Sequence, residues 1–348
     1  MVAGLLSGQV ARAVENGVTD AQMQNWRSAT FGMFVHWGAY AYLAGAWNGE
    51  RVNGYSEHIM RSMEIPLAEY NEKVVANFNP QEFDAEEWVQ IAKAAGMRYL
   101  VITAKHHDGF AMWDSRLTDY DIIDSTPFGR DPMRELRDAT KKAGLLFGFY
   151  YSHAQDWSHP WGQRNSRDFG YEQPQKRRWW EQPEWSEYVE KSWIYVNEKS
   201  IPQMEELITG YDPDIMWFDT HNWLPKEMTQ VIVERAKELK PDLIVNSRGT
   251  PEIKDYSNTN DRPEYFQRTD IEYWEGIPTT NDSYGYHAYD KSHKPVSFFV
   301  RLMVRAAARG GNLLMNVGPM GSGEIDPVDV KILQGIGDWL IPIGESIY

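Results

Sequence analysis

Polar side chains able to do chemistry follow one apolar run of strand-forming residues. The segment "RYLVITAKHHDGFAMWDS", residues 98–115, passes directly from strand formers to Lys105, His106, His107 and Asp108. Successive strand residues point to opposite faces, so adjacent imidazoles can face one site only where the strand has ended. In parallel β/α units, the loops that follow the strands carry the chemistry. We therefore expect the two histidines at the C-terminal rim of such a unit.

Other apolar runs also end in polar residues. Asp219 follows "IMWF", and a carboxylate there is costly to bury unless it is hydrogen-bonded or functional. Asp219 could instead be a helix or loop cap. His106 and His107 could instead be structural, with their hydrogen bonds holding a loop in place. The other residues at such positions are His36, Tyr150, Tyr151, Ser152, Arg248 and Asn316.

A metal site is a competing interpretation of the histidines. His36, His106, His107 and Asp108 could supply nitrogen and oxygen ligands. The spacing lacks the alternate-residue H-x-H pattern that would place two imidazoles on one strand face. We therefore expect neither a metal ion nor an organic cofactor.

The elements that must position these residues alternate between strand and helix patterns. Apolar runs such as "FGMFV", "YLVIT", "LLFGFYY", "DIMWF", "LIVNS" and "NLLMNV" are separated by amphipathic segments such as "DAEEWVQIAKAAG" and "PKEMTQVIVERAKELK". This alternation is typical of βα units on a parallel sheet. It predicts a (β/α)8 barrel, irregular in its later units, with a doubly wound open sheet as the alternative. The long irregular stretch 248–295 is of a kind that usually carries an active site or a lid.

Composition excludes several classes of protein. The net charge of −15 argues against a nucleic-acid partner, which requires clustered Lys and Arg. The absence of cysteine excludes disulfides and thiol catalysis. No apolar run reaches the ~18 residues of a membrane span. The start "MVAGLLSGQVARAVENG" does not have the pattern of an intact signal peptide. Aromatic residues make up 14% of the chain, which suits a protein that binds sugars.

Nine motifs in order carry a resemblance to a known family. They are "FGMFVHWGAY", "FNPQEFDAEEW", "TAKHHDGFAMWDS", "DSTPFGRD", "FGFYYS", "WFD", "WEGIPTTNDSYGY", "NLLMNVGP" and "IGDWLIPIGESIY". Together they resemble the catalytic barrel of the retaining α-L-fucosidases, glycoside hydrolase family 29. The resemblance covers Trp26 to Tyr348. We expect a helical lead-in at 1–25 and a catalytic barrel at 26–348, without the β-sandwich that family members often carry after the barrel. The resemblance implies an exo-acting enzyme, periplasmic or secreted, that acts on an oligosaccharide substrate.

The resemblance also implies roles for individual residues. Asp219 would be the nucleophile, and Arg248 would keep it ionised. Three histidines would bind the fucose hydroxyls, and Trp217 would contact the sugar. Tyr150 matches a family tyrosine, with Tyr151 as the neighbour to test. The full set of expected substrate-binding residues is His36, Glu57, His106, His107, Tyr150, Trp217 and Arg248.

Two departures from the family pattern affect these expectations. The family's Glu-Trp pair stands here as Glu57-His58, which could shift the preference toward a galactose-configured sugar with a C6 hydroxyl. The general acid/base lies in a variable loop, where Glu264 keeps the family's Pro-Glu pair and Glu275 is the second candidate. Other carboxylates in the same loop are Asp261, Asp270 and Glu272.

In the implied mechanism, the acid/base protonates the departing oxygen while Asp219 attacks the anomeric carbon, and water then hydrolyses the ester. The alternatives are an α-L-galactosidase-like relative, a non-catalytic sugar-binding barrel and a metal-dependent hydrolase.

Overall fold

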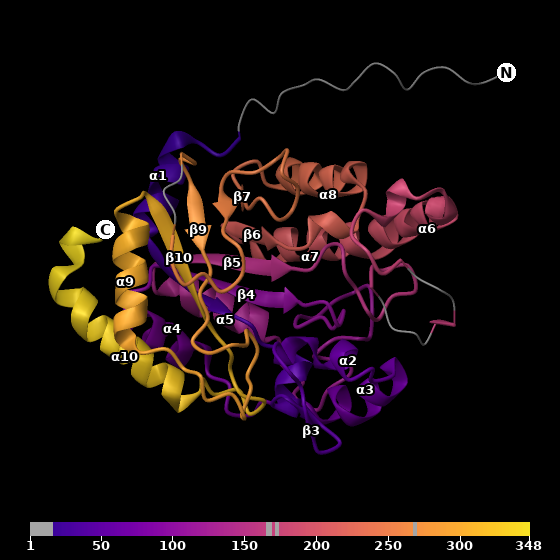
Figure 1. Ribbon diagram of the computed structural model, residues 1–348, viewed down its shortest axis with the longest axis horizontal. Helices are drawn as coiled ribbons and strands as arrows, with labels where there is room; N and C mark the ends of the chain where they lie inside the picture. The colour runs from indigo at the N-terminus through magenta and orange to yellow at the C-terminus, as the bar shows by residue number, and fades with distance from the viewer. Residues whose placement is uncertain (1–16, 165–168, 171–173, 267–269) are drawn as a thin grey trace.

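Eight parallel strands form the centre of the molecule, which a computed structural model describes for residues 17–164, 169–170, 174–266 and 270–348 (Figure 1). In chain order these strands are β1 (Phe31–Val35), β4 (Tyr99–Lys105), β5 (Leu146–Tyr151), β6 (Ile215–Phe218), β7 (Ile244–Val245), β8 (Ser257–Asn258), β9 (Trp274–Gly276) and β10 (Gly311–Val317). Neighbours in the sheet are neighbours along the chain, and β1 pairs with β10. The predicted (β/α)8 fold is confirmed.

The barrel closes at a seam between β7 and β8, where side chains take part in the pairing. Asn246, directly after β7, forms an isolated parallel bridge with Tyr256, directly before β8. Beside this bridge, the Asp255 amide donates to the Val245 carbonyl over 2.9 Å. The Val245 amide donates in turn to Oδ2 of Asp255 over 2.7 Å. The strands on either side of the seam are only two residues long.

Helices cover the outside of the barrel. They are α4 (Ala85–Ala94), α5 (Pro132–Lys142), α6 (Ser186–Tyr195), α7 (Ile201–Tyr211), α8 (Lys226–Leu239), α9 (Val296–Ala307) and α10 (Pro327–Leu340). α4 begins where the sequence predicts, because Oδ1 of Asp84 caps the amides of Glu86 and Glu87. Within the described residues no helix lies between β7 and β9, which confirms the predicted irregularity of the later units. α6 and α7 follow one another directly and are separated only by a π-helical turn at Val196–Ser200.

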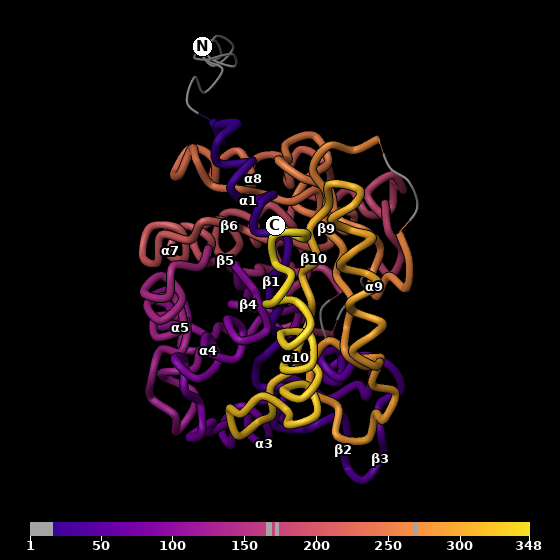
Figure 2. The backbone as a smooth tube through the Cα atoms, turned by 90° about the vertical axis from the view of Figure 1, so that its left-hand side faces the viewer, coloured from indigo at the N-terminus to yellow at the C-terminus, as the bar shows by residue number. Residues whose placement is uncertain are grey.

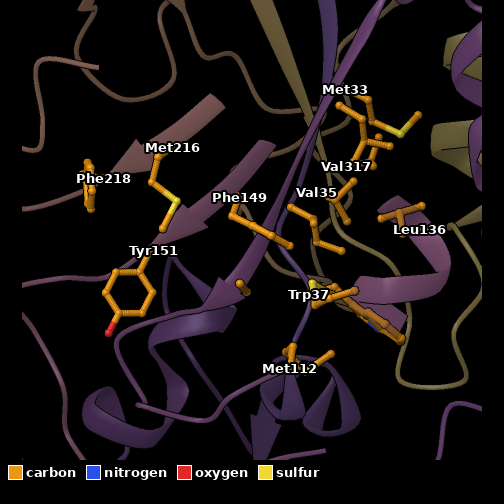
Figure 3. Packing of buried hydrophobic residues seen from close by; sticks show 14 of the residues in the cluster. Met33, Val35, Trp37, Met112, Leu136, Phe149, Tyr151, Met216, Phe218 and Val317 are labelled. Carbon is orange, nitrogen blue, oxygen red and sulfur yellow. The ribbon is translucent and has the colours of Figure 1, made fainter. Parts of the chain in front are cut away.

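Alternate strand residues divide the core into two layers. Met33, Val35, Phe149 and Met216 belong to the outer cluster, and Figure 3 shows their side chains together with Leu136 of α5. The residues between them in sequence belong to a second cluster, inside the barrel: Phe34, Tyr150, Ile215 and Trp217. The period of two in a strand produces this division. The Tyr150 side chain therefore points into the barrel and the Tyr151 side chain points out of it. From the sequence, Tyr150 is the residue expected to face the site.

The segment between β1 and β4 contains shorter elements: β2 (Ala46–Trp47), β3 (Glu50–Arg51), α2 (Ile59–Ser62) and α3 (Leu67–Lys73). A 3-10 turn at Ser56–His58 just before α2 carries Glu57 and His58.

α1 (Asp20–Ala29) lies next to the C-terminal end of the chain (Figure 2). Residues of α1 and of the segment 341–346, together with Tyr348, line one shared cavity at the N-terminal ends of β4 and β5. Residues 1–16 of the expected lead-in lie outside the described residues. Among the described helices, none combines the length and the apolar character that crossing a bilayer would require.

Candidate active site

A cavity of about 550 Å³ opens at the C-terminal ends of the strands. This volume is in the range of small-molecule sites. Most of the predicted site residues line it: His36, Glu57, His106, His107, Tyr150, Trp217, Asp219 and Arg248. A larger cavity of about 1150 Å³ lies at the N-terminal ends of β4 and β5, among residues 96–98, 143–146 and 341–348. It contains no histidine and no paired carboxylates, so we place the chemistry in the smaller cavity.

Asp219 is fixed from three sides directly after β6. The Tyr150 hydroxyl donates to its Oδ2 over 2.9 Å, and Nη1 of Arg248 lies 3.3 Å from its Oδ1. The Thr220 amide also donates to Oδ1, over 2.8 Å, from a left-handed backbone with φ of 63°. Burial raises the pKa of Asp219 above its ordinary value, although Arg248 and the Tyr150 bond act in the opposite direction. Burial thus outweighs the effect expected of Arg248.

Two histidines present their Nε2 atoms to the cavity as hydrogen-bond acceptors. Nδ1 of His36 lies 2.6 Å from Oδ1 of Asn316, whose amide nitrogen donates to the Tyr284 carbonyl. Because the Asn316 oxygen can only accept, His36 carries its proton on Nδ1. Nδ1 of His107 lies 2.6 Å from Oγ of Ser152, and that hydroxyl donates to a backbone carbonyl. His107 therefore has the same tautomer, and its Nε2 faces Oδ2 of Asp219 across 3.7 Å.

Burial keeps these imidazoles neutral. It lowers the pKa of His36 to about 3 and that of His58 to about 4, and it holds the pKa values of His106 and His107 well below the ordinary value. Neutral rings that present lone pairs suit sugar hydroxyl groups, which need acceptors for their protons.

His58, His106 and His107 form a cluster that the sequence did not predict as a unit. Their ring nitrogens lie within 4.8 Å of one another, a set that could hold a metal ion. Asp108, which the metal interpretation included, instead accepts a bond from the Tyr70 hydroxyl over 3.2 Å and does not line the cavity.

Glu275 lies beneath the cavity. It is fully buried and does not line the cavity. It accepts hydrogen bonds from the Tyr99 hydroxyl, Nε1 of Trp217 and Nδ2 of Asn258, at 2.9–3.0 Å. Burial raises the pKa of Glu275 to about 7, against the effect of these three donors. Through Trp217, which stacks on Tyr150 at 5.4 Å, Glu275 supports the aromatic floor of the site.

Arg248 joins Asp219 to a second carboxylate. Its Nη2 donates to Oδ1 of Asp261 over 2.6 Å and to the Thr259 carbonyl over 2.9 Å. Burial alone lowers the pKa of Arg248, but the charges of Asp219 and Asp261 outweigh it and raise the pKa above the ordinary value. Asp261 lines the cavity, and 44% of its side chain is exposed, so it lies at the mouth.

The remaining acid/base candidates lie elsewhere. Glu264 is exposed and does not line the cavity. Asp270 and Glu272 are also exposed and outside the lining. The Pro-Glu pair in the sequence thus did not identify the carboxylate that reaches the cavity.

Glu57 and His58, which stand where the family has its Glu-Trp pair, both line the cavity. Oε2 of Glu57 accepts from the Gly285 amide over 2.8 Å and from the Ser283 hydroxyl over 3.2 Å. Burial raises the pKa of Glu57 to about 7, against these bonds. His58 packs against His107 and Trp157, with ring centroids 5.5 and 5.6 Å away.

Sequence reasoning missed a buried ion pair that supports the histidine loop. Nζ of Lys105 lies 2.9 Å from Oδ2 of Asp156, and both side chains are fully buried. Next to Asp156, the Trp157 amide donates to the His107 carbonyl over 2.8 Å. The pair thus links the end of β4 to the segment after β5. Its only signal in the sequence is the lysine at the end of an apolar strand.

Comparisons with known proteins agree on one family. The family model described as α-L-fucosidase matches residues 7–345. An α-L-fucosidase of Dictyostelium discoideum is 27% identical over all of this chain and 76% of its own length. The crystal structure of an α-L-fucosidase from Vibrio sp. strain EJY3 is 34% identical, with a TM-score of 0.85 over 95% of this chain.

The present chain spans 57% of that Vibrio chain. The α-L-fucosidase AlfC from Lactobacillus casei, in complex with α-L-fucose product, is 31% identical, with a TM-score of 0.81 over 94% of this chain and 100% of its own. The chain belongs to the α-L-fucosidase family of glycoside hydrolases, whose reaction is the release of terminal α-L-fucose.

Proposed function

We propose that the chain releases terminal α-L-fucose by a retaining double displacement in which Asp219 is the nucleophile. The observation that carries this proposal is the position of the Asp219 carboxylate, which lines the cavity directly opposite Nε2 of His107. The Tyr150 hydroxyl and Arg248 orient that carboxylate. Retaining glycosidases need such a carboxylate below the anomeric carbon to form the glycosyl–enzyme ester.

We assign the fucose ring to the part of the cavity between the histidines and Trp217. Nε2 of His36 and Nε2 of His107 would each accept a sugar hydroxyl. The Trp217 ring would provide a flat apolar surface for the sugar, and Arg248 lies over this ring with its Cζ 5.2 Å from the centroid. AlfC in its complex with fucose supports the assignment of this monosaccharide.

For the acid/base we propose Asp261 in place of Glu264. A general acid must reach the oxygen of the departing group, which leaves toward solvent. Asp261 lies at the cavity mouth, whereas Glu264 does not contribute to the lining. In the second half-reaction the same carboxylate would take a proton from the attacking water.

Turnover of 4-nitrophenyl α-L-fucoside by the wild type and by Asp219→Ala tests the proposal. We expect Asp219→Ala to lose about 10³-fold or more in kcat with an unchanged circular dichroism spectrum. A mechanism-based 2-fluorofucosyl reagent should label the peptide that contains Asp219. Near-normal turnover by the variant, or a label on another peptide, would contradict this assignment.

His58 supports a second candidate, an enzyme that also accepts α-L-galactosides. Its imidazole lines the cavity where the family pattern has an aromatic residue, and it could hydrogen-bond a C6 hydroxyl. The ratio of kcat/KM for the 4-nitrophenyl galactoside and fucoside measures this. His58→Trp should shift the ratio toward fucose, and an unchanged ratio would exclude the idea.

A further inference from the structure

Arginines without carboxylate partners occupy one side of the active-site cavity. Arg164 and Arg177 both line it, and in the described part of the chain neither forms an ion pair with Asp or Glu. The chain as a whole has 50 acidic and 35 basic residues, so partners are abundant elsewhere. Of the carboxylates that line the cavity, Asp219 and Asp261 are both engaged by Arg248, and Glu57 accepts from the Gly285 amide and the Ser283 hydroxyl. This side of the cavity is therefore positively charged.

The guanidinium of Arg164 is held in place and partly desolvated. Its Cζ lies 4.6 Å from the centre of the Trp223 ring, and its Nε is buried without a hydrogen-bond partner in the described residues. Nη1 of Arg61 donates to the Arg164 carbonyl, and its Nη2 donates to Gln175 over 2.9 Å. A charge that is partly buried beside other cations is costly unless a ligand compensates it.

The charge of the Arg164 guanidinium affects the pKa values of its neighbours in the cavity. Burial, and after it the nearby charges of Arg61 and Arg177, lower the pKa of Arg164 to about 10. After burial, the Arg164 charge is also among the causes that lower the pKa of His58 and of His107. Arg164 therefore lies next to the imidazoles that would hold the fucose, whereas Arg177 is exposed at the mouth.

We propose that Arg164 and Arg177 form a subsite for an anionic substituent, a sulfate or a carboxylate, on the sugar to which the fucose is attached. The proposal rests on the fucosidase activity proposed above. Two planar guanidinium groups can each donate paired hydrogen bonds to oxygens of either anion, the planar carboxylate or the tetrahedral sulfate. Because Arg177 lies at the mouth, the anion belongs to the second sugar and not to the one at the floor. The preferred substrates are then fucosylated acidic oligosaccharides.

The test compares fucosyl disaccharides that differ only in the charge of the second sugar: fucosyl-galactose, its 6-O-sulfate and the matching galacturonide. We expect kcat/KM to be roughly ten- to a hundredfold higher for at least one acidic substrate, because charge-assisted bonds are the strong ones. If the 6-O-sulfate has the higher kcat/KM, the subsite prefers sulfate, and if the galacturonide has it, the subsite prefers a carboxylate. The preference should shrink at high ionic strength.

Variants separate this subsite from the catalytic centre. Arg164→Ala and Arg177→Ala should each reduce the acidic-to-neutral ratio of kcat/KM, and Arg177→Glu should invert it. Arg130→Ala removes an equal charge from a distant surface ion pair and should leave the ratio unchanged. Inorganic sulfate should inhibit the wild type competitively and Arg164→Ala much less.

A ratio near one in the wild type would overturn the subsite, while turnover of the neutral disaccharide would leave the fucosidase proposal standing. If no fucoside were cleaved, the fucosidase proposal itself would fail.

Discussion

The Tyr150 hydroxyl donates a 2.9 Å hydrogen bond to Oδ2 of Asp219 and thereby joins the end of β5 to the end of β6. Tyr150 lies in β5 and Asp219 directly follows β6, and these two strands pair in register with Tyr150 opposite Trp217. The bond depends on strand phase, because a one-residue slip would bring Tyr151 into the barrel instead.

Removing this hydroxyl should change the pH profile of the enzyme. Burial already raises the pKa of Asp219, and the Tyr150 bond is one of the interactions that lower it. Tyr150→Phe should therefore raise this pKa further, so the acidic limb of kcat/KM moves to higher pH. We also expect a loss of about 10- to 100-fold in kcat, since a bond to a charged acceptor contributes about 1.5–3 kcal/mol.

The matched control is Tyr151→Phe. Its hydroxyl donates to the Ser200 carbonyl outside the barrel, so the limb should stay in place. If both variants shifted the limb equally, the assignment to Asp219 would be wrong.

The acid/base should be found at Asp261. Asp261→Ala should lose about 10²- to 10⁴-fold in kcat/KM for substrates with poor leaving groups. The loss should be smaller for 4-nitrophenyl fucoside, and azide should restore turnover. Glu264→Ala is the control and should stay near wild type, because the Glu264 side chain does not line the cavity. Azide rescue of Glu264→Ala alone would reverse the assignment.

Glu275 should make the protein less stable as pH rises. Its pKa is about 7 in the folded state and near its ordinary 4.5 when unfolded. Between these two pH values the folded state holds a proton on Glu275 that the unfolded state has lost. The contribution of Glu275 to stability is therefore fully present below about pH 4.5 and is lost as pH rises through 7. The loss amounts to ~3 kcal/mol. Urea denaturation of the wild type and Glu275→Gln between pH 5 and 8 should show a steeper decline for the wild type.

A second substitution at the same position tests the hydrogen bonds. In Glu275→Gln, the amide oxygen can accept from Trp217 and Asn258, and the amide nitrogen can donate to the Tyr99 hydroxyl. Glu275→Met leaves all three donors unpaired and should be less stable than Glu275→Gln by about 2 kcal/mol or more. Equal stability of the two variants would show that the bonds contribute little.

Transition-metal ions should inhibit the enzyme through the histidine cluster, whereas chelation should not. No step of the proposed mechanism uses a metal, so activity should survive exhaustive EDTA treatment. Zn²⁺ can draw together the neutral imidazoles of His58, His106 and His107 next to Asp219. We expect reversible inhibition by Zn²⁺, with calorimetry showing one bound ion. His58→Trp should weaken Zn²⁺ binding by roughly tenfold or more. Unchanged binding by this variant would show that Zn²⁺ does not bind at the histidine cluster.

The sequence predicted the barrel well where its strands are long. The runs at β1, β4, β5, β6 and β10 hold four to seven buried residues, enough to recognise a strand and its inward face. β8 and β9 were not predicted, because segments of two and three residues carry no readable alternation. They lie within the stretch expected to be irregular.

The site was predictable where it depends on strand ends and not where it depends on the path of a loop. Asp219, His107 and Tyr150 meet because parallel strands end at one rim. Which carboxylate of the loop after β8 reaches the cavity depends on three-dimensional contacts such as the bond between Arg248 and Asp261. The proximity of His58 to the histidine pair likewise depends on how the turn before α2 folds over the barrel.

The seam between β7 and β8 lies between the two carboxylates that Arg248 connects. One follows β6, and the other follows β8. Across the seam, side chains supply part of the pairing: Nδ2 of Asn246 donates to Oδ1 of Asn258, and the Asn258 amide donates to Oγ of Ser247. The segment after β8, which carries Asp261, can therefore change in evolution to suit new leaving groups. The segment after β6, which carries Asp219, keeps its geometry. Arg248 must be kept in either case, because it forms ion pairs with both Asp219 and Asp261.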